Sequence, residues 1–175
     1  MKDFHKLPHF TGKSWQGGSD FPDGKLGWAQ LTATGGHPGN DLQHAVIRRW
    51  VAPTNMTISV RGELKHEPEA GDGVRAFVVS SQRGELKSVT VHHATEQIMV
   101  DAFEVTPGES VDFIVSIHQS LNSNQFLWAP EIVSSKTWDA KKDFAGPAPD
   151  YVEPLQPWAQ YAQALLLSNE FSFID

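Results

Sequence analysis

Apolar and polar residues alternate along short segments in the middle of the chain. Residues 56–64 read Met-Thr-Ile-Ser-Val-Arg-Gly-Glu-Leu, and residues 111–117 read Val-Asp-Phe-Ile-Val-Ser-Ile after a Pro107–Gly108 turn. Because successive side chains of a strand point to opposite faces, both segments predict strands with one buried face. Similar runs predict six further strands, at 27–33, 44–51, 73–80, 86–92, 97–105 and 125–133. About eight antiparallel strands separated by turns predict a mostly β fold, a jelly-roll sandwich.

The composition changes on either side of this region, so three segments are predicted. Residues 1–26 are rich in Gly, Pro, Ser and Asp with aromatic residues between them, which predicts an irregular segment packed on the sandwich. Residues 27–135 are predicted to form the sandwich itself. Residues 136–175 begin as a Pro-rich connection and end in a predicted amphipathic helix and tail, because apolar residues follow Pro157 at helical spacing. A chain of 175 residues suits one domain with such an appendage.

Charge and cysteine content exclude several classes of function. The chain has 14 Lys and Arg against 21 Asp and Glu, a formal net charge of -7, so a nucleic-acid partner is not expected. It has no cysteine, which excludes disulfides, thiolate metal sites, haem attachment motifs and a Cys nucleophile. No apolar run approaches the roughly 18 residues of a membrane span, so no membrane span is expected.

Several strings resemble one family. They are Leu31-Thr-Ala-Thr-Gly-Gly-His-Pro-Gly39, Ile47-Arg-Arg-Trp-Val-Ala-Pro53, Gly71-Asp-Gly-Val-Arg75, Phe126-Leu-Trp-Ala-Pro130 and Ala162-Gln-Ala-Leu-Leu-Leu-Ser-Asn-Glu-Phe171. Together they resemble the C-terminal part of large planctomycete-type cytochrome c proteins, whose C-terminal regions are domains of unknown function. The resemblance implies a piece of an exported multidomain protein, hence an extracytoplasmic location, with a sandwich like those of non-catalytic carbohydrate-binding modules. The haem motifs of that family need cysteines, which this chain lacks.

A glycine-rich loop and its neighbours form the predicted ligand site. Glycines let a backbone approach a ligand closely, and sugars stack on aromatic rings while their hydroxyl groups accept charged hydrogen bonds. The predicted ligand-binding residues are His37, Asn40, Asp41, His44, Arg48, Trp28 and Trp15. The alternative interpretation is a structural glycine turn, with Arg49 paired to a carboxylate.

The strand at 44–51 carries two adjacent arginines that must point to opposite faces. Ala45, Ile47 and Val51 favour one face as the core. This predicts that Arg48 lies on the outer, ligand-facing side and that Arg49 is partly buried and needs a partner.

Two other sites are weaker candidates. Asp72, Asn122 and Asn124 offer oxygen ligands on loops, as a structural calcium ion requires, although a plain β-turn explains the same residues. A stacking platform for a sugar could include Trp15, Trp28, Trp128 and Trp138, although a tryptophan in a small sandwich is usually part of the core. Trp128 shares its strand face with apolar residues and is expected inside, whereas Trp15 and Trp28, near glycine loops, are the better exposed candidates.

Three functions follow from these observations. The preferred one is a non-catalytic module that binds a polysaccharide or other glycan, with no cofactor except possible structural calcium. The first alternative is a structural or interaction domain that docks on neighbouring domains of its parent protein. The second is a metal-dependent, cupin-like enzyme using His92, His93, Glu96 and His118, but the adjacent histidines should point to opposite faces.

Overall fold

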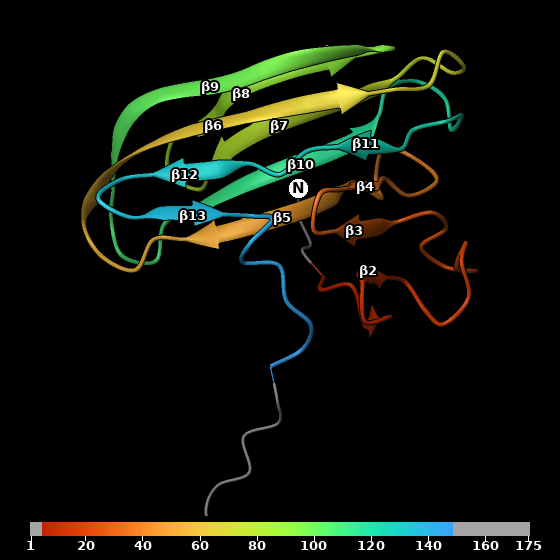
Figure 1. Cartoon of the computed structure of the whole chain (residues 1–175), viewed down its shortest axis with the longest axis horizontal. Coiled ribbons are helices and arrows are strands. Elements are labelled where there is room, and N and C mark those ends of the chain that lie inside the picture. Colours follow the sequence, from red (N-terminus) through yellow and green to blue (C-terminus); the bar gives the residue numbers. More distant parts are fainter. Residues whose placement is uncertain (1–4, 149–175) are drawn as a thin grey trace, which may run out of the picture.

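The computed structural model describes residues 5–148, which fold into thirteen strands and no helix (Figure 1). The strands are β1 (His9–Phe10), β2 (Ser14–Gln16), β3 (Gln30–Thr32), β4 (Gly35–His37), β5 (Val46–Val51), β6 (Met56–His66), β7 (Val74–Ser80), β8 (Gly84–Val91), β9 (Ala94–Val105), β10 (Ser110–Ile117), β11 (Phe126–Leu127), β12 (Glu131–Val133) and β13 (Thr137–Asp139). Each of the eight predicted strands has a counterpart.

The strands form two antiparallel sheets. The small sheet has the order β5-β10-β7-β8, and the large, nine-stranded sheet has the order β1-β2-β3-β4-β11-β6-β12-β13, with β9 on the other side of β6. The prediction of a mostly β fold is therefore confirmed. Figure 1 shows β6 and β9 of the large sheet lying along β7 and β8 of the small one, so the two sheets face each other as layers of a sandwich.

The predicted strand at 125–133 is divided in two. Leu127 of β11 pairs with Lys65 at one end of β6, and β12 pairs with β6 further along, where Ile132 lies opposite Val60. Between them, the backbone N–H of Trp128 bonds to the carbonyl of Thr34 instead, and Pro130 has no N–H to donate. The strand is interrupted because these residues cannot continue the ladder along β6.

Apolar side chains from both sheets form the core. Ile58, Val60 and Leu64 alternate along β6 with exposed or half-buried residues, as the sequence predicts. Strand β10 is buried along its whole length, since it is an inner strand of the small sheet. Trp128 is 2% exposed and packs edge-on against Phe113, at 5.7 Å between ring centroids, so its predicted inward position is confirmed.

The orientation predicted for the strand at 44–51 is wrong. In β5, Arg48 lies opposite Phe113 of β10, within the inward-facing set, and Arg49 lies opposite Asp112 on the outer face. Each face of β5 carries apolar residues as well as one arginine, so the pattern within the strand does not decide its orientation. The register with β10, whose buried Phe113 faces the core, decides it.

The sheet extends beyond the predicted segment boundaries. Strands β1 and β2 lie within residues 1–26, and β13 lies within 136–175. Phe10 of β1 packs closely on Gly146, where an added Cβ would lie 2.6 Å from the ring. The predicted amphipathic helix lies outside the described residues.

Candidate functional site

A cavity of about 330 Å³ lies where β2, β5 and the segment after β13 meet. We call it the aromatic cavity. Its lining includes Trp15, Arg48, Trp50, Phe113, Trp138 and Phe144. These residues come from both sheets and from the chain leaving β13, so only the folded protein brings them together. Figure 1 shows β5 and β13 running alongside each other at this place.

Ring contacts and one hydrogen bond hold the aromatic side chains in position. Trp50 and Trp138 meet at 5.3 Å between ring centroids with their planes at 64°. Trp15 packs on Phe10 at 5.1 Å, and its Nε1 donates a 2.8 Å hydrogen bond to the carbonyl of Ala145. Phe10 also contacts Phe144 at 6.2 Å. The cavity therefore has aromatic walls supported by their neighbours.

Arg48 supplies a positive charge inside this cavity. Its Nη2 donates hydrogen bonds to the carbonyls of Thr32 and Gly35, the second at 3.0 Å. Its Cζ lies 5.7 Å from the centroid of the Phe144 ring. Burial lowers the pKa of Arg48 to about 10, because the charged form loses hydration. The guanidinium group is still protonated at neutral pH.

Arg49, on the outer face of β5, has the carboxylate partner that the sequence led us to expect. Its Nε and Nη2 donate to the two carboxylate oxygens of Asp112, each at 2.7 Å. These hydrogen bonds raise the pKa of Arg49. The two neighbouring arginines therefore have different surroundings: Arg49 pairs with Asp112 on the outer face of the small sheet, and Arg48 faces the cavity.

Two carboxylates also line the aromatic cavity, and both take part in the turn after β13. Asp139 Oδ1 accepts the backbone N–H groups of Lys141 and Lys142, at 2.9 and 3.2 Å, and its Oδ2 lies 3.1 Å from Lys142 Nζ. Asp143 Oδ2 accepts the backbone N–H of Asp139 at 3.0 Å. These contacts shape the rim of the cavity.

A second group of aromatic residues forms a surface that we call the loop platform, comprising Phe21, Trp28 and His37. Phe21 and Trp28 are 41% and 38% exposed and meet edge to face at 5.2 Å. Trp28 lies 5.7 Å from His37, whose Nδ1 donates to the carbonyl of Pro38 at 2.6 Å. Burial lowers the pKa of His37. The platform is a partly exposed aromatic face.

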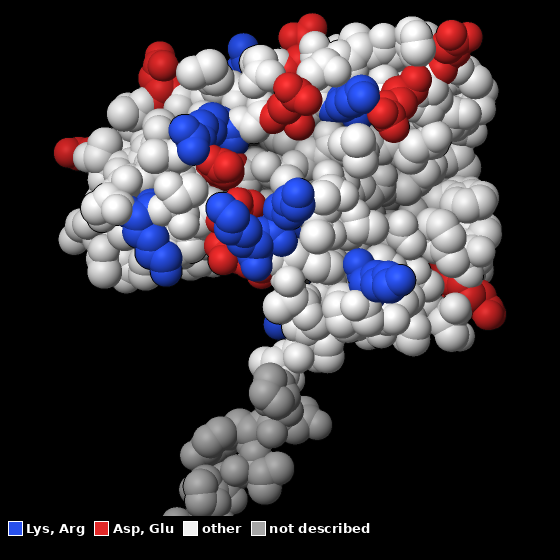
Figure 2. Space-filling model, viewed as in Figure 1, with Lys and Arg blue, Asp and Glu red and all other residues white. Residues whose placement is uncertain are grey.

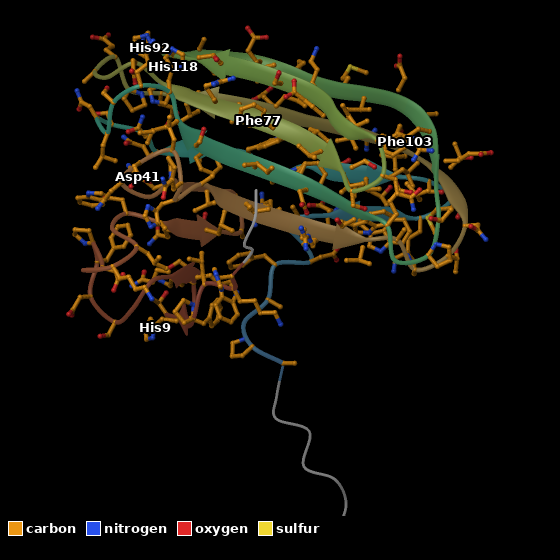
Figure 3. The ribbon with its side chains drawn as sticks, turned by 180° about the vertical axis from the view of Figure 1, so that it is seen from behind. His9, Asp41, Phe77, His92, Phe103 and His118 are labelled. Atoms are coloured by element: carbon orange, nitrogen blue, oxygen red, sulfur yellow. The ribbon has the colours of Figure 1, made fainter. Side chains whose placement is uncertain are left out.

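Asn40, Asp41 and His44 form a turn beside this platform. Asp41 Oδ1 accepts the backbone N–H groups of Gln43 and His44 and contacts His44 Nδ1 at 2.8 Å. The side-chain hydrogen bond to His44 lowers the pKa of Asp41. The Asn40 side chain lies against Gly27, which has a positive φ of 61° and no room for a Cβ. Asp41 is exposed on the loop seen in Figure 3.

A wider groove of about 1000 Å³ adjoins the cavity, sharing Trp15 and Leu31 with it. We call it the apolar groove; its lining includes Leu7, Leu26, Leu42, His44, Val46 and Ile47.

The predicted ligand residues are thus divided among the cavity, the groove and the platform. Trp15 and Arg48 line the cavity, His44 lines the groove, and Trp28 and His37 form the platform.

Part of the predicted glycine loop has a structural role. Gly35 and Gly36 lie in β4, between β3 and β11. A Cβ on Gly35 would lie 2.0 Å from the carbonyl oxygen of Phe126, and one on Gly36 would lie 2.2 Å from that of Gln30. These glycines let the neighbouring strands approach.

The predicted calcium residues lie together and bind the backbone. Asp72 Oδ2 accepts the N–H groups of Gln119 and Ser120, each at 3.0 Å. The fully buried Asn124 accepts the N–H of Asn122 through Oδ1 and donates to the carbonyl of Gly73, both at 2.8 Å. Calcium binding stays a prediction.

The histidines of the metal-enzyme hypothesis lie at one end of the sandwich, where Figure 3 shows His92 and His118 close together. His92 and His93 bond to the backbone carbonyls of Glu69 and Glu67. Within residues 5–148, no group of three or more His, Asp or Glu side chains is placed to hold a metal ion.

Sequence reasoning did not single out His66, which is fully buried in β6. Its Nε2 donates to the carbonyl of Ser123 at 2.7 Å, and its Nδ1 accepts the N–H of His93 at 3.2 Å. The alternation that places Leu64 inside continues to His66, and this signal could have identified it. Phe144 of the aromatic cavity was also missed, because it falls in a segment without periodic pattern.

Acidic and basic side chains are interspersed on the face shown in Figure 2, and they form no continuous basic stripe there. That face offers no extended track for a phosphate backbone.

In the part of the chain that the structure describes, no helix is long and apolar enough to cross a membrane. Comparisons with protein-family models, curated proteins and solved structures find no match for this chain.

Proposed function

We propose that this chain is a non-catalytic glycan-binding module and that the aromatic cavity is its sugar site. The observation that carries the proposal is the meeting of Trp15, Trp50 and Trp138 around the half-buried guanidinium of Arg48. Sugar rings present C–H faces that pack on aromatic rings, and their hydroxyl groups accept hydrogen bonds from charged donors. A volume of about 330 Å³ is at the small end of ligand pockets, which suits one or two sugar residues.

The finer parts of the proposal rest on the sequence. We propose a jelly-roll arrangement for the sandwich on the basis of the count of predicted strands. The parent, an exported protein like the planctomycete-type cytochromes c, and the extracytoplasmic location rest on the matching strings alone.

The loop platform is the other place where a sugar could stack, so the experiment compares the two. Isothermal titration against a panel of neutral and acidic polysaccharides identifies a ligand for the wild-type protein. We expect Trp138→Ala to weaken binding at least about tenfold, since loss of a stacking ring removes on the order of 1 kcal/mol or more. Trp28→Ala, on the platform, is expected to leave binding unchanged.

Met99→Ala is the control, because Met99 is 66% exposed on β9 and lies outside the cavity lining. Thermal melting shows whether each variant is folded. If the platform variant loses binding and the cavity variant keeps it, the assignment of the site is wrong. If no polysaccharide in the panel binds, the proposed function itself fails.

The apolar groove favours one alternative, an interaction domain that docks on the rest of its parent protein. The groove is wide and lined mostly by apolar residues, including the 61% exposed Leu42. Such surfaces often mark protein contacts. Leu42→Asp should abolish co-purification with the separately expressed remainder of the parent while leaving glycan binding intact; unchanged co-purification would argue against docking here.

A further inference from the structure

The charge of Arg48 is half-buried and has no carboxylate partner among residues 5–148. Its hydrogen bonds go to the carbonyls of Thr32 and Gly35, and its remaining contact is with the ring of Phe144. Charges withdrawn from water are normally paired with an opposite charge, since they lose part of their hydration. Carbonyl dipoles and an aromatic ring compensate only part of this loss. An anion in the cavity would complete the compensation.

The acidic side chains nearby are engaged elsewhere. Asp112 forms its bidentate pair with Arg49 on the other face of β5. Asp139 is bound by the backbone of its own turn and by Lys142. Asp143, which also lines the cavity, accepts the backbone N–H of Asp139 at 3.0 Å. None of these carboxylates forms an ion pair with Arg48 within the described residues.

Arg48 also keeps donors available. A guanidinium group carries N–H groups on all three nitrogens, and the hydrogen bonds of Arg48 to described residues use Nη2 alone. The N–H groups on Nε and Nη1 remain for a ligand in the cavity that Arg48 lines. Because both N–H groups of Nη2 are used by the two carbonyls, a carboxylate would accept a single charge-assisted hydrogen bond, from Nη1 or Nε.

We propose that the glycan bound in the aromatic cavity is acidic and carries a uronic acid residue, whose carboxylate pairs with Arg48 while the sugar ring packs on Trp50 or Trp138. This inference rests on the proposed function and specifies its substrate class. The aromatic walls shield the pair from part of the solvent, so the charge contact contributes more than it would on an open surface.

The test uses a matched pair of ligands and isothermal titration. An oligosaccharide of uronic acid residues is compared with the same oligosaccharide after reduction of its carboxyl groups to alcohols. We expect the wild-type protein to bind the acidic form on the order of tenfold more tightly, as a single charge-assisted hydrogen bond implies. This preference is measured on the wild-type chain and needs no variant.

Two substitutions then assign the preference to Arg48. Arg48→Gln should bind both forms equally, and Arg48→Lys should recover only part of the preference, because lysine keeps the charge but its ammonium group is more strongly hydrated than a guanidinium. Arg75→Gln is the control: Arg75 is an exposed arginine on β7 that packs over Phe77 at 5.0 Å, outside the cavity. Melting curves confirm that the variants are folded, since Arg48 also holds the turn between β3 and β4.

The outcomes separate the two proposals. Equal wild-type binding of both forms overturns the inference about Arg48 and leaves the glycan-binding function standing. A preference that persists in a folded Arg48→Gln variant overturns it as well. Binding of a sulfated glycan but not of the uronic acid oligosaccharide overturns the carboxylate assignment. If no glycan of any kind binds, both proposals fail.

Discussion

The indole Nε1 of Trp15 donates a 2.8 Å hydrogen bond to the carbonyl of Ala145, 130 positions further along the chain. This bond ties β2, at the start of the described residues, to the segment that leaves β13. Both residues line the aromatic cavity. The bond therefore holds one wall of the cavity against another.

We expect Trp15→Phe to lower the free energy of unfolding by about 1 kcal/mol, since the ring is kept and one hydrogen bond is lost. Urea titration followed by tryptophan fluorescence measures this change. Trp28→Phe is the control, because the Trp28 indole makes ring contacts and no hydrogen bond to any residue between 5 and 148. Equal losses in both variants would show that the bond to Ala145 contributes nothing.

Gly35 is expected to tolerate no side chain. A Cβ there would lie 2.0 Å from the carbonyl oxygen of Phe126, so Gly35→Ala must separate β4 from β11. We expect a loss of about 1–3 kcal/mol or more in unfolding free energy. Gly24→Ala, where a Cβ would meet nothing within 4 Å, should be nearly neutral. A Gly35→Ala protein as stable as the Gly24→Ala protein would contradict the close approach of these strands.

Glu109 should make the protein less stable in acid. Its side chain is fully buried; burial alone would raise its pKa, but hydrogen bonds from Ser80 and the Thr106 backbone and the charge of Arg83 outweigh this and lower the pKa below 4.5. The carboxylate therefore stabilises the fold above pH 4.5, and this stabilisation is lost as pH falls through the folded-state pKa.

The measurement is the free energy of unfolding between pH 3 and pH 7. The difference in stability between the wild type and Glu109→Gln should shrink as the pH drops below about 4.5. Glu104→Gln, at an exposed position on β9, serves as the control. A difference that is constant across this range would disprove the assignment.

His66 should add a second acid-sensitive step at higher pH. Burial lowers its pKa below the ordinary value of 6.5, despite the opposing hydrogen bond to Ser123. The unfolded chain therefore binds the proton more readily, and stability falls as pH drops below about 6.5. His66→Gln should reduce this slope between pH 5 and pH 7 and leave the part that His37 contributes, whereas His5→Gln, at an exposed position, should keep the full slope. An unchanged slope in the His66 variant would count against this origin.

The strands that the sequence predicts share one property, a run long enough for alternation to be visible. Residues 56–66 and 110–117 show it clearly, and both are found as β6 and β10. Strands β1, β2, β4 and β13 were missed because each has two or three residues. Such short strands are defined by the partner they pair with, and their own pattern carries little information.

The candidate site was predicted in part for a similar reason. Trp15 and Arg48 were identified as ligand residues, and both line the aromatic cavity. They were expected beside His37 and His44, which the fold places on the platform and the groove. Sequence proximity suggested one site, but only the start of β4, Gly35, contacts Arg48, whereas His37 at the end of β4 packs on Trp28 of the platform.

The sequence by itself determined that this chain forms a sandwich with an apolar interior, because the period of its apolar residues matches the pleat of a strand. Only the tertiary structure decided which face of β5 is inside. Both faces of that strand offer apolar residues and one arginine, so the choice depended on the register with β10 and on Asp112 being opposite Arg49. That choice placed Arg48 among the tryptophans, a meeting of distant residues that no local pattern encodes.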